Sequence, residues 1–212
     1  MTQLTAQTQD KLQTDEQQPA PVKARRWRIT LNAPVVLGFV GLCLAALIAG
    51  ELSNGALTRS FFMTYHSSLL SPLTYLRMFS HVLGHSGWEH FVGNMAYILL
   101  LGPLLEEKYG SKSLLVVMLI TALVTGLVNY VFFWNQALCG ASGICFAFIL
   151  LSSVTSFKEG EIPLTFLLVA IIFLGQQIVQ GVFVQDNVSN LSHIIGGIVG
   201  AVAGFFLGRN KA

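Results

Sequence analysis

The feature that most constrains this chain is a long stretch without charge. Between Lys112 and Lys158 there is no Lys, Arg, Asp or Glu. This stretch is long enough for two membrane spans of about 20 residues each, with a polar turn at Asn135 and Gln136 between them. Only 10% of the whole chain is charged, against about 25% in soluble domains. We therefore expect a polytopic membrane protein, because a water-soluble core cannot hide that much apolar sequence.

Apolar sequence recurs in six segments along the chain. They are residues 34–50, 88–105, 113–133, 141–157, 162–182 and 190–208. Helices are the expected spanning form, because an open sheet edge in lipid would leave backbone groups without hydrogen bonds. The predicted fold class is an all-α polytopic membrane protein with a bundle of six transmembrane helices.

The start of the chain differs from the rest in composition. Residues 1–32 are rich in Gln, Thr and Pro and end in a basic cluster, so they cannot bury enough apolar surface to fold alone. We expect 1–32 to be a disordered cytoplasmic tail, 33–208 to form the membrane domain, and 209–212 to be a cytoplasmic end. The first apolar segment has no clear small-residue cleavage site, so it is expected to be a span rather than a removed signal peptide.

Basic residues fall unevenly on the two sides of such a bundle. With six spans both termini lie on one side, and that side holds all Lys and Arg residues except Arg59 and Arg77. The positive-inside rule therefore places both termini in the cytoplasm. The outer face then holds a long loop, about 51–87, and short loops near 134–140 and 183–189. The long loop contains many aromatic and leucine residues, so we expect it to be partly helical and to lie in the outer membrane interface.

The sequence Gly140-Ala-Ser142-Gly143 opens the fourth apolar segment. Ser142 is expected at the N-terminus of a helix, where backbone N–H groups are unpaired and the helix dipole favours a developing negative charge. The small neighbours let a substrate carbonyl approach the backbone closely. These residues indicate a nucleophile. The alternative that the motif alone leaves open is a small-residue packing face, which many membrane helices have.

His193 lies near the outer start of the sixth segment, three residues before a glycine series. The spacing of four puts Gly196 and Gly200 on one helix face, which lets the sixth helix pack closely against a partner. If that partner is the fourth helix, which has its own small face at Gly143, His193 is positioned to accept the Ser142 proton. The alternative is a buried neutral histidine bonded to a backbone carbonyl.

His90 and Asn94 are four residues apart and project from one side of the second helix. Two side-chain donors aimed at one point can join the Ser142 backbone N–H in stabilising an oxyanion. His81 and His85 have a spacing that is also found among metal ligands, but no HExxH motif accompanies them. We therefore expect no metal site and no cofactor.

Together these motifs resemble those of the rhomboid intramembrane proteases over residues 34–208. The shared pattern comprises Arg77, the His81 to His85 spacing, His90-x-x-x-Asn94, Glu106-x-x-x-Gly110, Gly140-Ala-Ser142-Gly143 and His193-x-x-Gly196-x-x-x-Gly200. The order and spacing of the motifs carry the resemblance, rather than any one of them alone.

The resemblance implies a six-helix rhomboid-like bundle that acts as an intramembrane serine protease. Its catalytic dyad would be Ser142 and His193. Its oxyanion hole would consist of His90, Asn94 and the Ser142 backbone amide. The implied partners are transmembrane protein substrates and the lipid bilayer, with no nucleic acid, and the implied location is a bacterial-type plasma membrane.

The resemblance also implies two further sets of residues. Those expected to support the site are His85, Phe146, Gly140, Gly143, Gly196 and Gly200. Those expected to be structural are Arg77, Glu106 and Gly110. Three positions depart from the usual family pattern: Phe146 replaces a frequent Tyr that stacks on the catalytic histidine, Leu76 replaces Trp before Arg77, and Ser192 replaces Ala before His193.

In the family, the fifth helix and the loop around 183–189 form a lateral gate and cap, and substrate helices enter between the second and fifth spans. The same arrangement is implied here. A rhomboid-like protein that binds or escorts membrane proteins without cutting them is the alternative function, but such relatives lack the serine or the histidine. A transporter with His193 in a proton relay would need intramembrane acidic partners, which the sequence does not offer.

Overall fold

The computed structural model describes residues 30–154, 162, 164–183 and 187–209 of the 212-residue chain. The chain divides into two units, Met1–Thr30 and Leu31–Ala212, and every helix within the described residues belongs to the second. Most of the expected N-terminal tail, residues 1–29, lies outside the described residues.

The described part of the chain is helical, which confirms the predicted all-α class. The elements in order are α2 (Pro34–Leu52), α3 (Ala56–Phe61), α4 (Pro72–Ser80), the 3₁₀ helix η1 (His81–Leu83), α5 (Trp88–Tyr109), α6 (Ser111–Phe132), α7 (Ser142–Val154), α8 (Leu164–Phe183) and α9 (Asn187–Arg209). Each of the six predicted apolar segments coincides with one of the helices α2, α5, α6, α7, α8 and α9.

Not all six of these helices have the composition of a simple membrane span. Within the described residues, three stretches are long and apolar enough to cross a membrane: Pro34–Leu52, Ser111–Phe132 and Asn190–Gly208. α5 is as long as α6, but its first turn carries Glu89 and its last turn carries Lys108. α7 is apolar but has only 13 residues, and the last part of its predicted segment, 155–157, lies outside the described residues.

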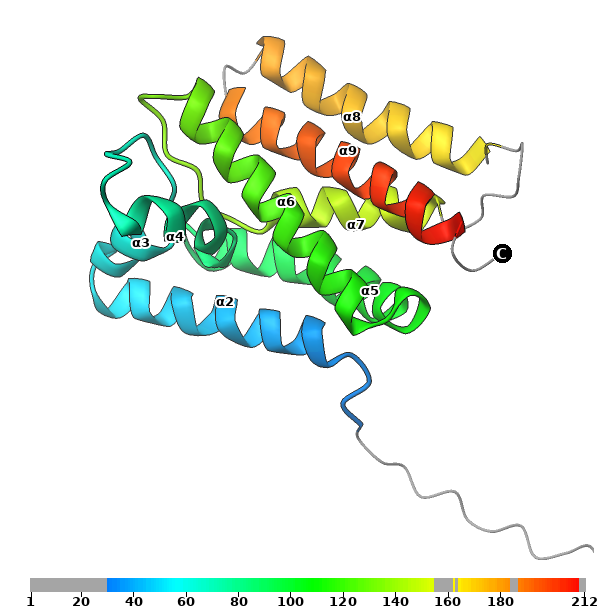
Figure 1. Ribbon diagram of the computed structural model, residues 1–212, viewed down its shortest axis with the longest axis horizontal. Coiled ribbons are helices and arrows are strands. Elements are labelled where there is room, and N and C mark those ends of the chain that lie inside the picture. The colour runs from blue at the N-terminus through cyan, green and yellow to red at the C-terminus, as the bar shows by residue number, and fades with distance from the viewer. Residues whose placement is uncertain (1–29, 155–161, 163, 184–186, 210–212) are drawn as a thin grey trace, which may run out of the picture. The chain divides into compact units, whose positions relative to one another are not determined.

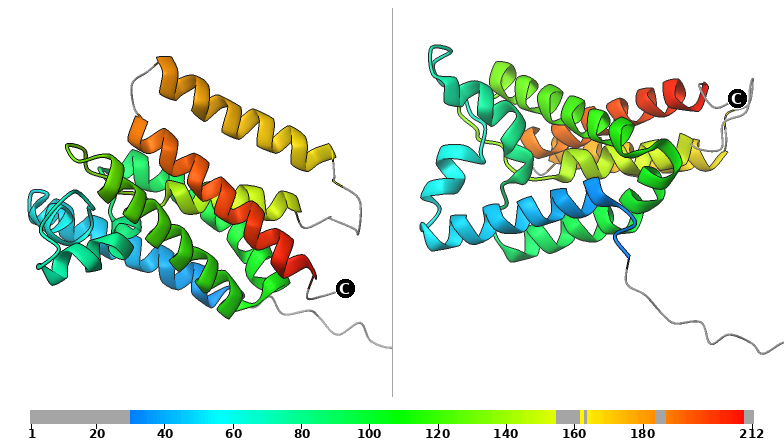
Figure 2. Two further views of the ribbon diagram at one scale, coloured as in Figure 1. Left: turned by 45° about the horizontal axis from the view of Figure 1, so that its top comes forward. Right: turned by 60° about the horizontal axis from the view of Figure 1, so that its bottom comes forward.

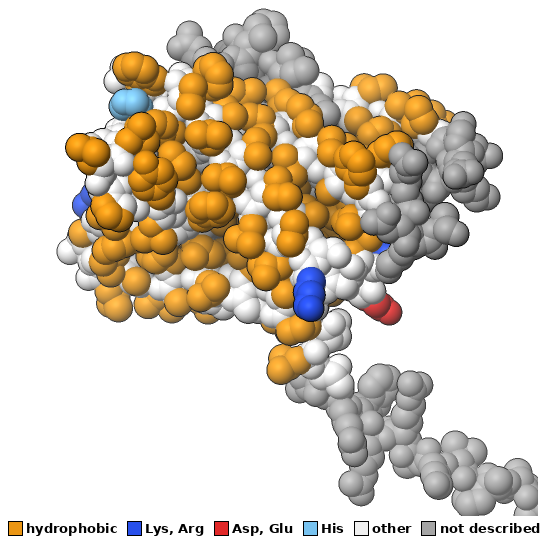
Figure 3. All heavy atoms as spheres, in the orientation of Figure 1, with side chains coloured by type: hydrophobic (Ala, Val, Ile, Leu, Met, Phe, Trp, Pro, Cys, Tyr) orange, Lys and Arg blue, Asp and Glu red, His pale blue; other side chains and the backbone are white. Residues whose placement is uncertain are grey.

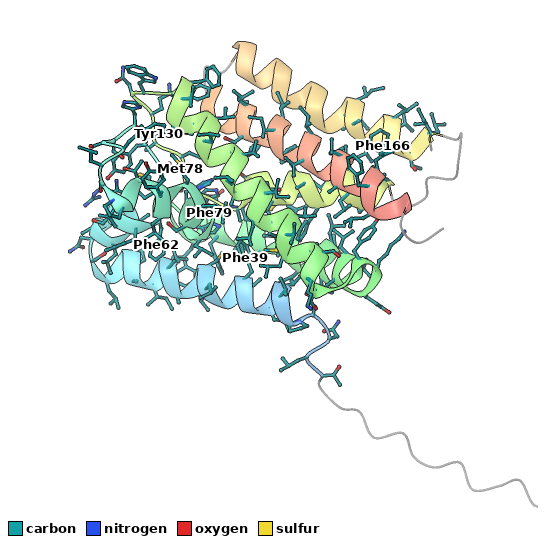
Figure 4. All side chains as sticks on the ribbon, in the orientation of Figure 1. Phe39, Phe62, Met78, Phe79, Tyr130 and Phe166 are labelled. Atoms are coloured by element: carbon teal, nitrogen blue, oxygen red, sulfur yellow. The ribbon has the colours of Figure 1, made fainter. Side chains whose placement is uncertain are left out.

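α7 is the central helix of the bundle. It packs against α5, α6, α8 and α9, and most of its side chains are buried. Figures 1 and 2 show α9 running beside α7, with α8 and α2 on opposite sides of the bundle. Phe148 of α7 is fully buried in a core that also contains Phe39 of α2, labelled in Figure 4. The helix that begins at Ser142 is therefore held from several sides.

Glu106 joins the start of α2 to the turn between α5 and α6. Its carboxylate accepts hydrogen bonds from the backbone N–H groups of Val35 and Val36, both at 3.0 Å, and from the hydroxyl of Ser111 at 2.7 Å. The N–H groups in the first turn of a helix have no intrahelical acceptors, so Glu106 caps α2 from another helix. Gly110 follows with a φ of +84°, a left-handed conformation that favours glycine.

The long loop between α2 and α5 is partly helical, as its composition predicts, and contains α3, α4 and η1. Arg77 of α4 is buried. Its Nε donates to the carbonyl oxygen of Ser60 at 2.8 Å, and its guanidinium lies 4.5 Å from the ring centroid of Tyr65. Arg77 thus ties α4 both to α3 and to the segment that follows α3.

This loop also contacts the segment before α7. Thr64 and Leu138 exchange two backbone hydrogen bonds of 2.9 Å, and this is the one β-bridge within the described residues. The ring of His66 stacks between those of Tyr130 and Trp134, with centroid distances of 4.7 and 4.6 Å. Figure 4 shows Tyr130 at the end of α6 beside this loop. The segment leading to Ser142 is therefore fixed against both the loop and α6.

Candidate active site

The turn before α7 places Ser142 as the first residue of that helix. Gly140 has a φ of +124°, and its N–H donates to the carbonyl oxygen of His81 at 2.9 Å. A methyl group at position 140 would lie 2.6 Å from Cε1 of His90. Glycine is required here both by its backbone conformation and by the closeness of the imidazole.

His90 presents a ring N–H toward this turn. Its Nδ1 accepts a long hydrogen bond from the backbone N–H of Ser86, at 3.4 Å, and lies 3.1 Å from the hydroxyl of the same residue. Since a neutral imidazole has one donor and one acceptor nitrogen, Nε2 carries the proton. That atom would be 2.7 Å from a Cβ at Gly140. His90 therefore offers a donor beside the turn that leads to Ser142.

Asn94 offers a second donor at the same place. The thiol of Cys145 donates to the Asn94 backbone oxygen at 3.4 Å and more weakly to Oδ1 at 3.7 Å, so the amide oxygen is directed toward α7. Nδ2 is buried and has no hydrogen-bond partner within the described part of the chain. It lies 3.6 Å from the Cβ position of Gly140. A buried donor without a partner is costly, so this amide is suited to a ligand that accepts a hydrogen bond.

His193 lies on α9, and its ring is stacked on Phe146 of α7. The two ring centroids are 4.4 Å apart and the planes differ by 7°. Phe146 is one helical turn after Ser142, so it occupies the same side of α7 as the serine. The Phe146 ring thus restricts the orientation of the His193 imidazole by stacking alone, because Phe has no hydroxyl group that could form a hydrogen bond.

The approach of α9 to α7 depends on the glycines of α9. A Cβ at Gly196 would overlap the carbonyl oxygen of Gly143, and a Cβ at Gly200 would overlap that of Ala147. The glycine spacing predicts a closely packed partner for the sixth helix, and that partner is the fourth helix, α7. Backbone contact brings the start of α9, with His193, close to the start of α7.

One pocket of about 350 Å³ joins these side chains. It is lined by Glu89, His90, Gly93, Asn94, Tyr97, Ser142, Cys145, Phe146, Ile149 and His193. The predicted dyad and the predicted side-chain donors of the oxyanion hole therefore share one cavity, to which α5, α7 and α9 contribute. Three further lining residues were not predicted as site residues, namely Glu89, Gly93 and Tyr97, although their spacing of four places them on one face of α5 next to His90 and Asn94.

His85 lies behind His90 rather than in the pocket. Its Nδ1 bonds the carbonyl oxygen of Leu83 at 3.1 Å, and its ring centroid is 5.1 Å from that of His90. Burial, with a smaller contribution from His90, lowers the pKa of His85 to about 4 against the opposing effect of the Leu83 carbonyl. His85 is therefore neutral at neutral pH and packs against His90 as an uncharged ring.

The spacing of His81 and His85 does not correspond to one helix face, because η1 ends at Leu83 between them. The ring of His81 bonds the carbonyl oxygen of Arg77 at 3.1 Å and lies 3.2 Å from the hydroxyl of Thr125. Across the described ranges, no three His, Cys, Asp or Glu side chains are grouped to hold a metal ion.

The three residues expected to be structural do not line the pocket; they are Arg77, Glu106 and Gly110.

Comparison with known proteins finds that the chain is similar to several proteins named as rhomboid proteases or rhomboid-related proteins. Rhomboid protease GlpG of Haemophilus influenzae is 27% identical over 133 residues, which cover 61% of this chain and 68% of that protein. Rhomboid-related protein 2 of Mus musculus is 30% identical over 158 residues, 65% of this chain and 52% of that protein. Rhomboid protease GlpG of Serratia proteamaculans is 25% identical over 182 residues, 84% of this chain and 64% of that protein.

The chain spans about half to two thirds of the length of these curated relatives. Residues 72–210 match the family model described as the Rhomboid domain, which covers more than half of the chain and includes the turn with Ser142, the donors on α5 and His193. The family match and the apolar helices of the chain together identify an integral membrane protein. The chain belongs to the rhomboid family.

Proposed function

We propose that this chain is an intramembrane serine protease in which Ser142 is the nucleophile and His193 its base. The observation that carries the proposal is the common pocket of Ser142, His193, His90 and Asn94. Relatives named rhomboid proteases support the same reaction class. The residues expected for the reaction thus come from three helices and line one cavity of about 350 Å³.

In the first step, His193 removes the proton from the Ser142 hydroxyl while the oxygen attacks the carbonyl carbon of a substrate peptide bond. The carbonyl oxygen becomes an oxyanion. It accepts hydrogen bonds from Nε2 of His90, Nδ2 of Asn94 and the backbone N–H of Ser142. The buried Nδ2 of Asn94 supports this role because it has no partner among the described residues.

In the second step, the tetrahedral intermediate collapses and the C–N bond breaks. His193 gives its proton to the leaving amine, and an ester remains on Ser142. A water molecule then attacks the ester with His193 as base, which releases a carboxylate product and restores the serine. The stacked ring of Phe146 keeps the imidazole in one orientation through both proton transfers.

The proposed topology follows from the charge distribution. Six spans would place both termini in the cytoplasm and the pocket near the outer face of a bacterial-type plasma membrane. The domain would extend over 33–208, between a cytoplasmic tail at 1–32 and an end at 209–212. Residues 184–186 of the expected cap lie outside the described residues. The proposed substrates are transmembrane proteins whose helices unwind locally near that face.

The test uses the purified full chain, a reporter membrane helix and a serine-reactive fluorophosphonate. Ser142→Ala is expected to abolish cleavage and labelling, and His193→Ala to abolish both because an unassisted hydroxyl is a poor nucleophile. Ser153→Ala is the matched control on α7, since its hydroxyl donates to the carbonyl oxygen of Ile149 and Ser153 does not line the pocket. Cleavage by the Ser142→Ala protein at the parental rate would refute the dyad. A parent that binds the reporter without cutting it would instead support a binding or escort protein.

A further inference from the structure

A second cavity lies away from the pocket of Ser142, between α6 and α9. It has a volume of about 540 Å³ and is lined mainly by aliphatic and aromatic side chains. Those that matter here are Val116 and Ile120 of α6 with Ile198, Val202 and Phe206 of α9, all of them exposed. In Figure 1 the two ribbons diverge toward the end where α6 begins and α9 ends. Figure 3 shows mostly hydrophobic side chains on this face.

One end of this groove is polar and basic. Lys112 and Ser113, in the first turn of α6, line it there. Lys112 is exposed, is the one charged residue among the lining residues, and forms no hydrogen bond or ion pair within the described part of the chain. The backbone N–H groups of this turn precede the first intrahelical bond, from Leu114 to Gly110, and so remain available as donors. This end is thus suited to an anion.

The dimensions of the groove match one leaflet of a bilayer. From Lys112 to Ile120 the α6 axis rises about 12 Å, and from Ile198 to Leu207 the α9 axis rises about 14 Å, at 1.5 Å per residue. Half of a hydrocarbon core about 30 Å thick is about 15 Å. An acyl chain whose headgroup is at Lys112 would therefore run along the full groove.

We propose that this groove is a binding site for one anionic phospholipid of the leaflet at the Lys112 end. The acyl chain lies between α6 and α9, and the phosphate binds Lys112 and the first turn of α6. The neighbouring carboxylate of Glu106 is buried, and three hydrogen bonds partly offset its negative charge: two from the N–H groups of Val35 and Val36 of α2, and one from the hydroxyl of Ser111 in the first turn of α6. The site is separate from the pocket of Ser142, and the inference does not depend on proteolysis.

The experiment measures lipid binding by native mass spectrometry and thermal unfolding of the full chain. The probes are phosphatidylglycerol and, for comparison, phosphatidylcholine with the same acyl chains. We expect one retained phosphatidylglycerol per chain and a higher unfolding temperature than with phosphatidylcholine. Equal retention and equal stabilisation by the two lipids would overturn the headgroup assignment.

Two variants and a matched control locate the site. Lys112→Gln is expected to weaken phosphatidylglycerol binding about fivefold, because a basic side chain near an anionic surface contributes that order of affinity. Val202→Trp is expected to remove the lipid by filling the groove. The control is Lys108→Gln: this nearby lysine lies 5.6 Å from the ring centroid of Tyr109 and does not line the groove.

The outcomes separate the lipid from other occupants. If Lys108→Gln and Lys112→Gln lost phosphatidylglycerol binding equally, the lipid would be attracted to basic residues in general, and the proposed site would be refuted. A different result would be that the chain forms dimers, and that Val202→Trp abolishes the dimers but leaves lipid retention unchanged. That result would show that a second copy covers the groove, and it would refute the lipid site. Unchanged binding in Lys112→Gln would refute the proposal even if Val202→Trp failed to fold.

Discussion

Replacing Gly200 by Ala tests whether backbone packing between α7 and α9 sets the geometry of the proposed active site. The added Cβ would lie 2.7 Å from Cα and C of Ala147, where an ordinary contact is 3.4 Å or more. The carbonyl oxygen of Ala147 would be closer still, so the helices must separate locally by about 1 Å or more, because backbone atoms cannot rotate away as a side chain does. Overpacking of this kind costs about 1–3 kcal/mol, against a gain of about 1 kcal/mol from the helix propensity of Ala.

The expected result is a lower unfolding temperature and a large loss of activity. A displacement of about 1 Å between His193 and Ser142 can lower the rate of cleavage about a hundredfold. Position 200 is two turns from His193 and does not line the pocket, so direct contact with substrate does not explain such a loss. The assays are thermal unfolding in detergent and cleavage of a reporter membrane helix.

Gly208→Ala is the control on the same helix, since its Cβ would meet no described atom within 4 Å. It is expected to keep parental activity and to be at least as stable as the parent, because Ala favours a helix and meets no obstacle there. A second check uses Ala147→Gly in the Gly200→Ala background: because the overlap is with backbone atoms of residue 147, removing its methyl group should not restore activity. If Gly200→Ala matched Gly208→Ala in both assays, or if Ala147→Gly rescued it, the packing argument would be wrong.

Three further predictions address single contacts. Asn94→Ala should lower turnover about a hundredfold to a thousandfold without abolishing it, as measured with the reporter helix, because one of three oxyanion donors is lost; an unchanged rate would remove Asn94 from the oxyanion hole. Glu106→Gln should leave one N–H of the first turn of α2 unpaired and destabilise the protein by about 1–3 kcal/mol in denaturation experiments, while folded protein keeps its activity. Phe146→Leu should slow cleavage and Phe146→Tyr should not, because only the aromatic rings can stack on His193; equal rates for the two variants would show that stacking does not matter.

The parts of the site that could be predicted from sequence depend on local periodicity. A spacing of four puts His90 and Asn94 on one face of α5, and the same spacing puts Gly196 and Gly200 on the face of α9 that meets α7. A small-residue motif before an apolar run predicts the helix that starts at Ser142. Periodicity needs no knowledge of which helices are neighbours, so it can be read from one chain.

The contacts that could not be predicted join residues far apart in the sequence. The thiol of Cys145 lies against Asn94, 51 residues earlier, and orients its amide. Thr64 pairs with Leu138 between two loops whose sequences carry no strand pattern. Such contacts arise only when the helices have packed, since neither partner has a local preference for the other. The resemblance of the motif implied a supporting role for His85, but it did not predict that the ring of His85 packs against that of His90.

The arrangement of the pocket explains why positions that touch no substrate should matter for the reaction. The proposed donors are on α5, the nucleophile on α7 and the base on α9, so no single helix or loop fixes their separation. Between α7 and α9 that separation depends on Gly196 and Gly200. Between α5 and α7 it depends on Gly140, whose N–H also donates to the carbonyl oxygen of His81 of η1. Because the geometry of a proton transfer is sensitive to about 1 Å, we infer that these glycines position the reacting groups as directly as Phe146 does, although they offer no functional group of their own.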